Sequence, residues 1–241
     1  MTTTGDVDAI GRVVATEAMP AGPHQFHFWT ATDTTLGIGA IVRVDRTGRV
    51  LGTIRVHEGA VKALRLHPQQ ELGVSCSADG ALLSWDFKGN LLEQFPGHTA
   101  IVDDVDIDPS GECITSVSRD FTMNVYRLHD GKLLHSFEIG RRSPKGVCFL
   151  DPQTVIITNY WGALLRVDLQ TQKILTKQIA ENGISAVARS GNYLVAVSYD
   201  GVAYLVRPHD LAVENTLRSM KQRLQPSQLI CPGEQLDPGL R

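Results

Sequence analysis

A repeat of 41 residues is the feature that most constrains this chain of 241 residues. Three pairs of residues keep this spacing: His57 and His98, Asp79 and Asp120, and Trp85 and Tyr126. Each repeat contains short runs in which apolar and polar residues alternate, and turn residues separate these runs. Such alternation indicates strands, because successive side chains of a strand point to opposite faces of the sheet. A fixed period of about 40–45 residues is typical of a propeller built from four-stranded blades.

Weaker copies of the pattern extend over residues 12–218 and bring the number of repeats to about five. They are marked by Val44-Asp45, by Val167-Asp168, and by Ser198 with Asp200 and Val206. We expect the first strand to start at Arg12 and to end at Pro20. Turn signals recur about every 8–12 residues, as in sandwiches and barrels of short strands. The sequence therefore predicts an all-β propeller of about five four-stranded blades, with a flexible leader at 1–11 and an irregular tail at 219–241.

Composition excludes several classes of function. The formal net charge is −3, which argues against a general binder of nucleic acid or anionic membranes. No stretch approaches the roughly 18 apolar residues that a membrane span needs. None of the four cysteines lies within four residues of another, so no zinc or redox motif is present, and we expect no metal and no cofactor: Cys76, Cys113, Cys148 and Cys231. Unpaired thiols and the absence of a signal peptide favour a reducing compartment, the cytoplasm.

The second and third repeats resemble the WD40 repeat family of β-propellers. Blades of that family carry a His before the first strand, a Ser or Thr late in the second, an Asp at the next turn and a Trp in the third. The resemblance implies that these side chains form a hydrogen-bonded chain that stiffens the blade. It assigns two such structural tetrads here: His57, Ser77, Asp79 and Trp85, and then His98, Ser118, Asp120 and Tyr126. The fifth repeat keeps only Ser198 and Asp200, and the fourth has Asn159 and Trp161 where the Ser and Asp would stand.

The same residues could also be taken for a catalytic Ser-His-Asp triad. Two observations favour the structural interpretation. The set occurs twice at one spacing, whereas an active site occurs once, and no Gly-x-Ser-x-Gly elbow accompanies it. Buried polar side chains need partners, and a chain of Asp, His and Ser satisfies them mutually.

Two classes of function remain for a five-bladed propeller. The first is a non-catalytic scaffold for protein–protein interaction, a subunit of a larger complex that presents loop residues on one face of the disc. The alternative is an enzyme that acts on carbohydrate, and the acidic run from Asp103 to Asp108 suggests it, because glycosidases need two carboxylates about 5–10 Å apart. We favour the scaffold, since a single acidic strand is more often a solvated face or an edge that contacts a partner.

The loops of the third and fourth repeats carry the candidate partner-binding residues: Arg119, Phe121, Arg141, Arg142, Lys145, Tyr160 and Trp161. Aromatic and Arg side chains are enriched in protein-binding hot spots. Trp161 stands where the family has an Asp, so it either binds a partner or fills the space that the missing tetrad leaves. We expect a protein or peptide partner, in particular an acidic segment. The loop after Asp33 is a second place where the pattern fails and function is expected.

The number of repeats raises the question of closure. Five blades must each turn by about 72° to close a ring, which propellers allow. An open or partial ring would instead leave two apolar blade faces exposed. Such faces would call for self-association or for a partner that completes the ring.

Overall fold

The computed structural model describes residues 12–22, 25–33, 39–140 and 142–218, and it describes side chains from Gly39 onward. Over these ranges the protein is all-β and contains no helix. Its strands form five antiparallel sheets of four strands, and in every sheet the strands are hydrogen-bonded in chain order. The leader at 1–11, most of the loop after Asp33, Arg141 and the tail at 219–241 lie outside the described residues.

The five sheets follow one another along the chain as five blades. The first contains β1 (Arg12–Gly22), β2 (Gln25–Asp33), β3 (Ala40–Asp45) and β4 (Val50–Ile54). The second contains β5 (Val61–Leu66), β6 (Leu72–Ser77), β7 (Leu82–Asp86) and β8 (Leu91–Gln94). The third contains β9 (Val102–Ile107), β10 (Cys113–Ser118), β11 (Thr122–Arg127) and β12 (Leu133–Glu138). The fourth contains β13 (Pro144–Asp151), β14 (Thr154–Asn159), β15 (Ala163–Asp168) and β16 (Ile174–Gln178). The fifth contains β17 (Ile184–Ser190), β18 (Tyr193–Ser198), β19 (Val202–Val206) and β20 (Val213–Arg218).

The prediction of five four-stranded blades is confirmed, but the predicted end of the first strand is wrong. β1 continues through Pro20, which pairs with Phe26, and the register becomes irregular between Pro20 and Gly22. Proline lacks the N–H that a ladder needs, so it is tolerated only at the edge of a sheet or at a bulge. β1 is such an edge, because β2 is its one hydrogen-bonded neighbour.

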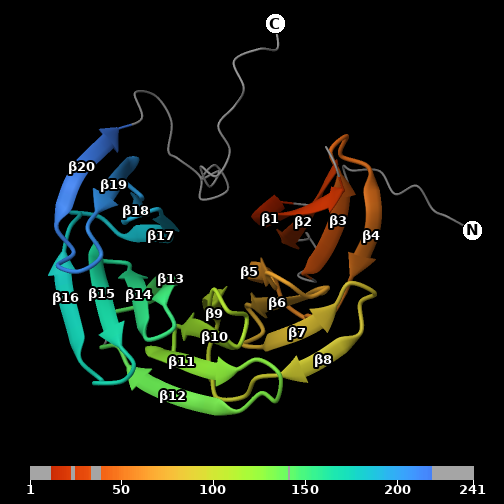
Figure 1. Ribbon diagram of the computed structural model, residues 1–241, viewed down its shortest axis with the longest axis horizontal. Coiled ribbons are helices and arrows are strands. Elements are labelled where there is room, and N and C mark those ends of the chain that lie inside the picture. The colour runs from red at the N-terminus through yellow and green to blue at the C-terminus, as the bar shows by residue number, and fades with distance from the viewer. Residues whose placement is uncertain (1–11, 23–24, 34–38, 141, 219–241) are drawn as a thin grey trace, which may run out of the picture.

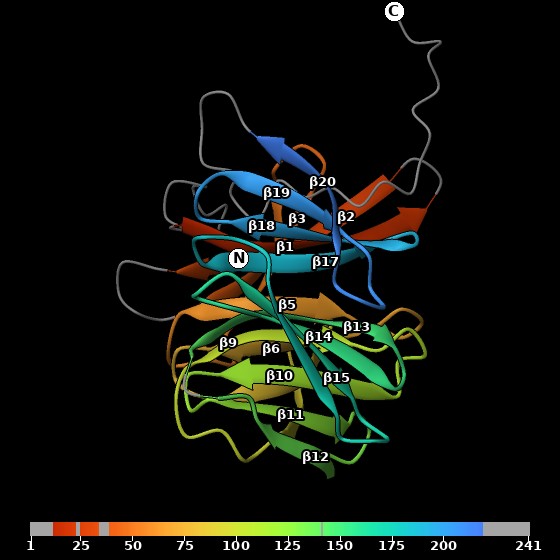
Figure 2. The same ribbon diagram turned by 90° about the vertical axis from the view of Figure 1, so that its left-hand side faces the viewer.

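The blades are arranged as an open arc around a central axis. The first strand of each blade lies innermost and the fourth lies outermost, as Figure 1 shows. Each innermost strand packs against the next one along the chain, from β1 through β5, β9 and β13 to β17. Among the described residues no comparable contact joins β17 to β1, and Figure 1 shows these two ends of the arc apart. Figure 2 shows the fifth blade above the fourth, with the third below.

The core lies between blades rather than within any one of them. Four clusters of buried apolar side chains fill the four contacts between successive blades. Between the first and second blades, for example, Ile41 packs with Leu64 and Trp85, and none of the three is exposed. A single sheet cannot bury both of its faces, so each blade depends on its neighbours for stability.

The Trp-Asp end of the second repeat has two separate structural roles. The ring of Trp85 lies over Gly73, its partner in the ladder, and a Cβ on Gly73 would lie 2.5 Å from that ring. Asp86 turns the chain from β7 to β8, because one carboxylate oxygen accepts hydrogen bonds from the backbone amides of Lys88 and Asn90 at 2.9 and 2.8 Å. Gly89 in this turn takes a positive φ of 93°, a conformation that tight hairpin turns favour.

Candidate functional site

A buried polar network in the second blade contains His57, Asp79 and Trp85 as expected, but its serine is Ser75. His57 Nε2 lies 2.7 Å from Ser75 Oγ, and Trp85 Nε1 donates a hydrogen bond of 3.0 Å to the same oxygen. His57 Nδ1 lies 3.3 Å from Asp79 Oδ2, which also accepts hydrogen bonds from the amides of Glu58 and Gly59. This arrangement puts the imidazole proton on Nδ1 and lets the Ser75 hydroxyl donate to Nε2.

The third blade repeats the network with one change. His98 bridges Ser116 Oγ at 2.8 Å and Asp120 Oδ2 at 3.0 Å. Tyr126 does not take the place of the indole, because its hydroxyl donates to the carbonyl of Pro96 and accepts from the amide of Asn124. The network of this blade therefore has three side chains, and Tyr126 satisfies its hydroxyl elsewhere.

The assignment of Ser77 and Ser118 to the tetrads is corrected by these contacts. Both serines lie two positions after the true partner of the histidine and at the end of the same strand. Each accepts a hydrogen bond of 3.2 Å from the backbone amide of the Asp that follows, Asp79 or Asp120. They fix the turn into the third strand and do not contact the histidine.

Electrostatics support a structural role for both networks. Desolvation opposes ionisation of Asp79, but hydrogen bonds from His57 and from backbone amides hold its pKa below the ordinary value. The pKa of Asp120 is lowered in the same way, by Thr122 and Thr99 against desolvation. Burial lowers the pKa of His98, and Asp120 opposes this shift only in part. Both serines are 0% exposed, so Ser75 and Ser116 cannot meet a substrate.

Two carboxylates of the acidic run in the third blade bind residues of the neighbouring blades. Asp104 and Asp106 accept hydrogen bonds from the amides of Val147 and Phe149 in the fourth blade, at 2.9 and 2.8 Å. Arg65 of the second blade lies 3.6 Å from Asp104 and 3.2 Å from Asp106. Burial raises the pKa of Asp104 to about 6 and raises that of Asp106, against the opposing effect of Arg65.

These bonds weaken the carbohydrate alternative. Asp108 binds its own turn through the amides of Ser110 and Cys113, and Asp103 pairs with two cations of the chain. No carboxylate of the run is left to approach a sugar. In the part of the chain that the structure describes, no group of three His, Cys, Asp or Glu side chains could hold a metal ion.

A different set of side chains gathers where the loops of three blades meet. Tyr160 and Trp161 follow β14, with ring centroids 6.1 Å apart, and Tyr199 follows β18, 5.6 Å from Tyr160. The guanidinium of Arg142 lies 5.8 Å from the centroid of Trp161, and Lys145 Nζ lies 5.6 Å from that of Tyr160. These distances permit cation–π attraction.

Arg119 completes this cluster from the loop after β10. It forms a two-pronged ion pair with Asp103, at 2.9 and 3.1 Å, and Lys145 reaches the same carboxylate at 3.1 Å. We call the following six residues the aromatic–cationic patch: Arg119, Arg142, Lys145, Tyr160, Trp161 and Tyr199. Its three cations face one carboxylate, so it keeps a net positive charge. Among the residues that the structure describes, no carboxylate pairs with Arg142.

The patch contains five of the seven predicted partner-binding residues. Phe121 lies at the rim of the same region, 40% exposed and in a left-handed conformation with φ of 68°, without a ring contact to the patch. Arg141 lies outside the described residues. Tyr199 was missed, although it stands between Ser198 and Asp200 as Arg119 stands between Ser118 and Asp120. Comparison of this one position in every repeat would have found it.

The two explanations for Trp161 are now distinguished by its exposure. Its side chain is 49% exposed and Tyr160 is 52% exposed, so neither fills the interior of the fourth blade. Ile139 and Ile157 fill that space. They lie 41 residues after His98 and Ser116 and are therefore their equivalents in the fourth repeat. Asn159 caps the turn instead of an Asp, because its side-chain oxygen accepts from the amides of Trp161 and Ala163 at 3.0 Å.

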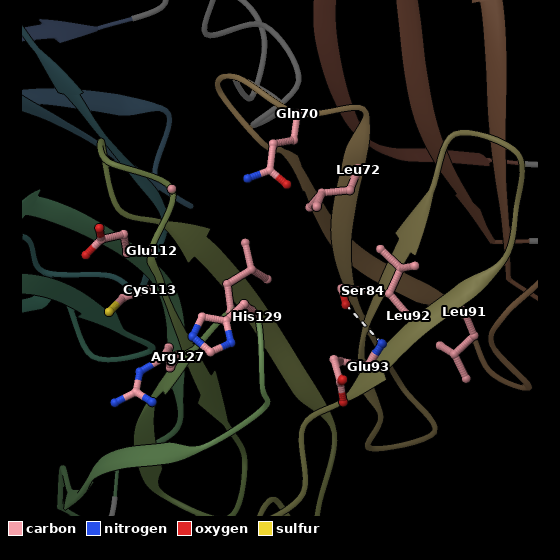
Figure 3. A pocket seen from close by; sticks show the side chains of 12 residues that line it. Gln70, Leu72, Ser84, Leu91, Leu92, Glu93, Glu112, Cys113, Arg127 and His129 are labelled. Atoms are coloured by element: carbon pink, nitrogen blue, oxygen red, sulfur yellow. Dashed lines mark hydrogen bonds between the residues drawn. The ribbon is translucent and has the colours of Figure 1, made fainter.

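A concave region lies between the outer strands of the second and third blades. It measures about 740 Å³, with Leu72, Leu91 and Leu92 on one side and Arg127 and His129 on the other (Figure 3). Cys113 lines it, and burial raises the pKa of its thiol with help from Asp108 and Glu112. Such a thiol is a weak nucleophile. The residues that line this concave region do not include a set of catalytic groups that point toward one another.

Comparison with known proteins supports the repeat pattern. The family model described as "WD domain, G-beta repeat" matches residues 48–86 and 89–127, which are the repeats with polar networks. Eukaryotic translation initiation factor 3 subunit I of Vanderwaltozyma polyspora is 27% identical over 82 residues, 34% of this chain and 24% of that protein. Protein groucho of Drosophila melanogaster is 29% identical over 93 residues, 38% of this chain and 13% of that protein.

Longer matches are weaker in sequence. Pre-mRNA-processing factor 19 of Oryza sativa is 25% identical over 166 residues, 65% of this chain and 32% of that protein. This chain thus spans less than a third of the length of each of these relatives. The crystal structure of the computationally designed Ika8 protein superposes with a TM-score of 0.67 and 20% identity, over 85% of this chain and 61% of that one. The described residues contain no helix that is long and apolar enough to cross a membrane.

Proposed function

We propose that this chain, whose residues 48–86 and 89–127 match WD40 repeats, is a non-catalytic scaffold that binds an acidic protein segment through the aromatic–cationic patch. The observation that carries this proposal is the exposure of Tyr160, Trp161 and Tyr199 beside Arg142, where four loops of three blades meet. A rigid disc holds these loops in place, and exposed aromatic and Arg side chains supply most binding energy at protein interfaces.

The charges of the patch favour an acidic segment over a neutral one. Asp103 neutralises part of the charge of Arg119 and Lys145, whereas Arg142 keeps its charge and lies over an exposed indole. A carboxylate of a partner could pair with Arg142 while an apolar side chain next to it covers Trp161. This combination of one charge and one aromatic anchor is the usual composition of a hot spot.

Two relatives give the scaffold a context. One of them is by name a subunit of a translation initiation factor, and another is a pre-mRNA-processing factor. We propose that this chain likewise acts as a subunit of a larger complex, with a protein partner rather than nucleic acid or a membrane. We propose a cytoplasmic location, which is supported by the free thiols of Cys76, Cys113 and Cys148, since reducing compartments preserve such thiols.

Affinity purification from the native source tests the proposal. The baits are the unaltered protein, Arg142→Glu, Arg141→Glu, Trp161→Ala, and Lys88→Glu as a matched control on the exposed hairpin of the second blade. The unaltered protein and the Lys88→Glu control should recover the same partner. Arg142→Glu and Trp161→Ala should each lower its recovery about tenfold or more, since hot-spot residues are worth about 2 kcal/mol or more. Equal recovery by all baits would refute the proposed site.

A further inference from the structure

The concave region between the outer strands of the second and third blades shares no residue with the aromatic–cationic patch. Its volume of about 740 Å³ lies within the range of sites that cover most of a bound ligand. Leucines from both blades line it, and Leu91 and Leu92 are 53% and 46% exposed. We call the following six residues the outer groove: Leu72, Leu91, Leu92, Glu93, Glu112 and Leu128.

The outer groove carries a net negative charge. Glu93 extends from β8 toward the third blade, because a Cβ on Gly131 would lie 3.5 Å from Glu93 Oε2. Glu112 is exposed in the turn before β10. In the part of the chain that the structure describes, neither carboxylate forms an ion pair, whereas Arg127 of the same region pairs with Asp130 at 2.8 Å. Two negative charges therefore remain for a partner to neutralise.

The thiol of Cys113 reports the same negative charge inside this region. Burial raises the pKa of Cys113, and the carboxylates of Asp108 and Glu112 raise it further. Arg127 opposes this shift only in part. The field next to Glu112 therefore favours a positive charge.

The packing of blades does not require these two carboxylates. His135 takes the place of Glu93 in the ladder of the third blade, since each stands opposite the equivalent residue of the strand before it. Gln153 takes the place of Glu112 in the fourth blade, because the carbonyls of both accept the same kind of hydrogen bond from the end of the third strand. The third and fourth blades thus pack with neutral or basic residues at these positions.

We propose that the outer groove binds an extended segment of a partner protein in which a leucine-like side chain is flanked by Lys or Arg. The apolar side chain covers Leu72 and Leu92, and the cations pair with Glu93 and Glu112. Figure 3 shows these two carboxylates on opposite sides of the space, which suits a segment that crosses it rather than a compact ligand. An apolar centre with a charged rim is the usual composition of an interface. This surface is opposite in charge to the aromatic–cationic patch and goes beyond the proposed function.

Fluorescence anisotropy with two labelled peptides and the full chain tests this inference. One is an octapeptide of alternating Lys and Leu, and the other has Gln in place of each Lys. The Lys–Leu peptide should bind with a Kd lower by about fivefold or more, since each of two partly exposed ion pairs contributes a few-fold. Joint replacement Glu93→Gln and Glu112→Gln should remove this preference. Glu138→Gln, at an exposed glutamate of the outer strand β12, is the matched control and should retain it.

Two further measurements separate the groove from other surfaces. Leu92→Ser should weaken the binding of both peptides and leave their order unchanged, because it removes part of the apolar surface that they share. A photoreactive leucine in the Lys–Leu peptide should crosslink to residues 84–93 or 111–129. Trp161→Ala should leave the binding of this peptide unchanged, so a failure of the proposed function at the patch can be distinguished from a failure here.

Three results would overturn the inference. One is the absence of saturable binding of the Lys–Leu peptide, or equal affinity of the unaltered protein for both peptides. Another is a preference for Lys that survives the joint replacement of Glu93 and Glu112, or that the Glu138→Gln control loses to the same extent. The third is a crosslink that maps to another blade or to the aromatic–cationic patch.

Discussion

The third and fourth blades fill the same interior positions with opposite kinds of side chain, polar in the third and apolar in the fourth. Equivalent positions lie 41 residues apart: His98 and Ile139, Ser116 and Ile157, Asp120 and Trp161, Tyr126 and Val167. In the third blade three of these side chains form a buried hydrogen-bonded chain. In the fourth blade the three apolar replacements are buried, and the residue at the position of the Asp, Trp161, turns to solvent.

This difference shows that the polar network restricts which residue can occupy the loop position after the second strand. A buried Asp–His–Ser chain is stable only when every member is present, because each unpaired group would cost about 1–3 kcal/mol. Its loop residue, Asp120, is therefore committed to the interior. An apolar core has no such requirement, so the loop position of the fourth blade is released. Four tests address this contrast, from the largest expected effect on stability to the smallest.

Placing the serine of the third blade into the fourth should have the largest effect. Ile157→Ser should lower the free energy of unfolding by about 4 kcal/mol, since it removes a buried aliphatic side chain and leaves a hydroxyl without His or Trp partners. Urea denaturation measures the change. Ile174→Ser on the exposed outer strand β16 is the control and should cost less than about 1 kcal/mol. A loss below about 1 kcal/mol for Ile157→Ser would contradict the argument.

Removal of the true serine of the third blade should have a smaller effect. Ser116→Ala leaves the buried ring nitrogen of His98 unpaired and should cost about 2 kcal/mol. Ser118→Ala removes bonds to backbone groups at the end of the strand and should cost about 1 kcal/mol. Denaturation of the two variants side by side checks the assignment. A larger loss for Ser118→Ala would restore the serine first predicted from the sequence.

The contribution of the third blade to stability should depend on pH, whereas that of the fourth blade should not. The pKa of His98 is lower in the folded protein than its ordinary 6.5, so the folded state binds fewer protons than the unfolded one below that value. The contribution of His98 is thus present above pH 6.5 and is lost as the pH falls below it. The difference in unfolding free energy between the unaltered protein and His98→Gln should shrink between pH 7.5 and 5.5. For Ile139→Val in the fourth blade the difference should stay constant.

Restoring the family residue to the fourth blade should have the smallest effect on stability. Trp161→Asp has no histidine to pair with, because Ile139 stands in its place, and the indole that it removes is 49% exposed. We expect a change within about 0.5 kcal/mol. Partner recovery, in contrast, should fall as for Trp161→Ala. A marked loss of stability would show that the indole supports the fold after all.

Much of the fold could be predicted, because the residues that recur in each repeat are those that pack in the core or form the turns. Alternation gave the strands, and the period of 41 residues gave the number of blades. The tetrad serine could not be identified in this way. Ser75 and Ser77 point to the same face of one strand, and both recur 41 residues later as Ser116 and Ser118. The repeat therefore supports either choice, and only the distance to His57 or His98 decides between them.

The sequence predicted which loops carry the residues of the candidate site, but it did not predict the ion pairs that these residues form. Position within the repeat placed Arg119, Tyr160 and Trp161 on neighbouring loops. The sequence did not show that Asp103 neutralises part of the charge of Arg119 and Lys145, because tertiary packing brings these residues together: Arg119 follows the strand paired with β9, and Lys145 comes from the fourth blade. The roles of Asp104 and Asp106 were hidden for the same reason, since their partners are backbone amides some 43 positions away.

That carboxylate pair has a consequence for how the protein unfolds. In a simple repeat array each unit touches only its neighbours, and units at the ends can open alone. Here Asp106 contacts both Arg65 of the blade before it and Phe149 of the blade after it. The three central blades are therefore coupled into one cooperative unit. Amide hydrogens of β9 and β13 should exchange with solvent together and slowly, and those of the first and fifth blades earlier.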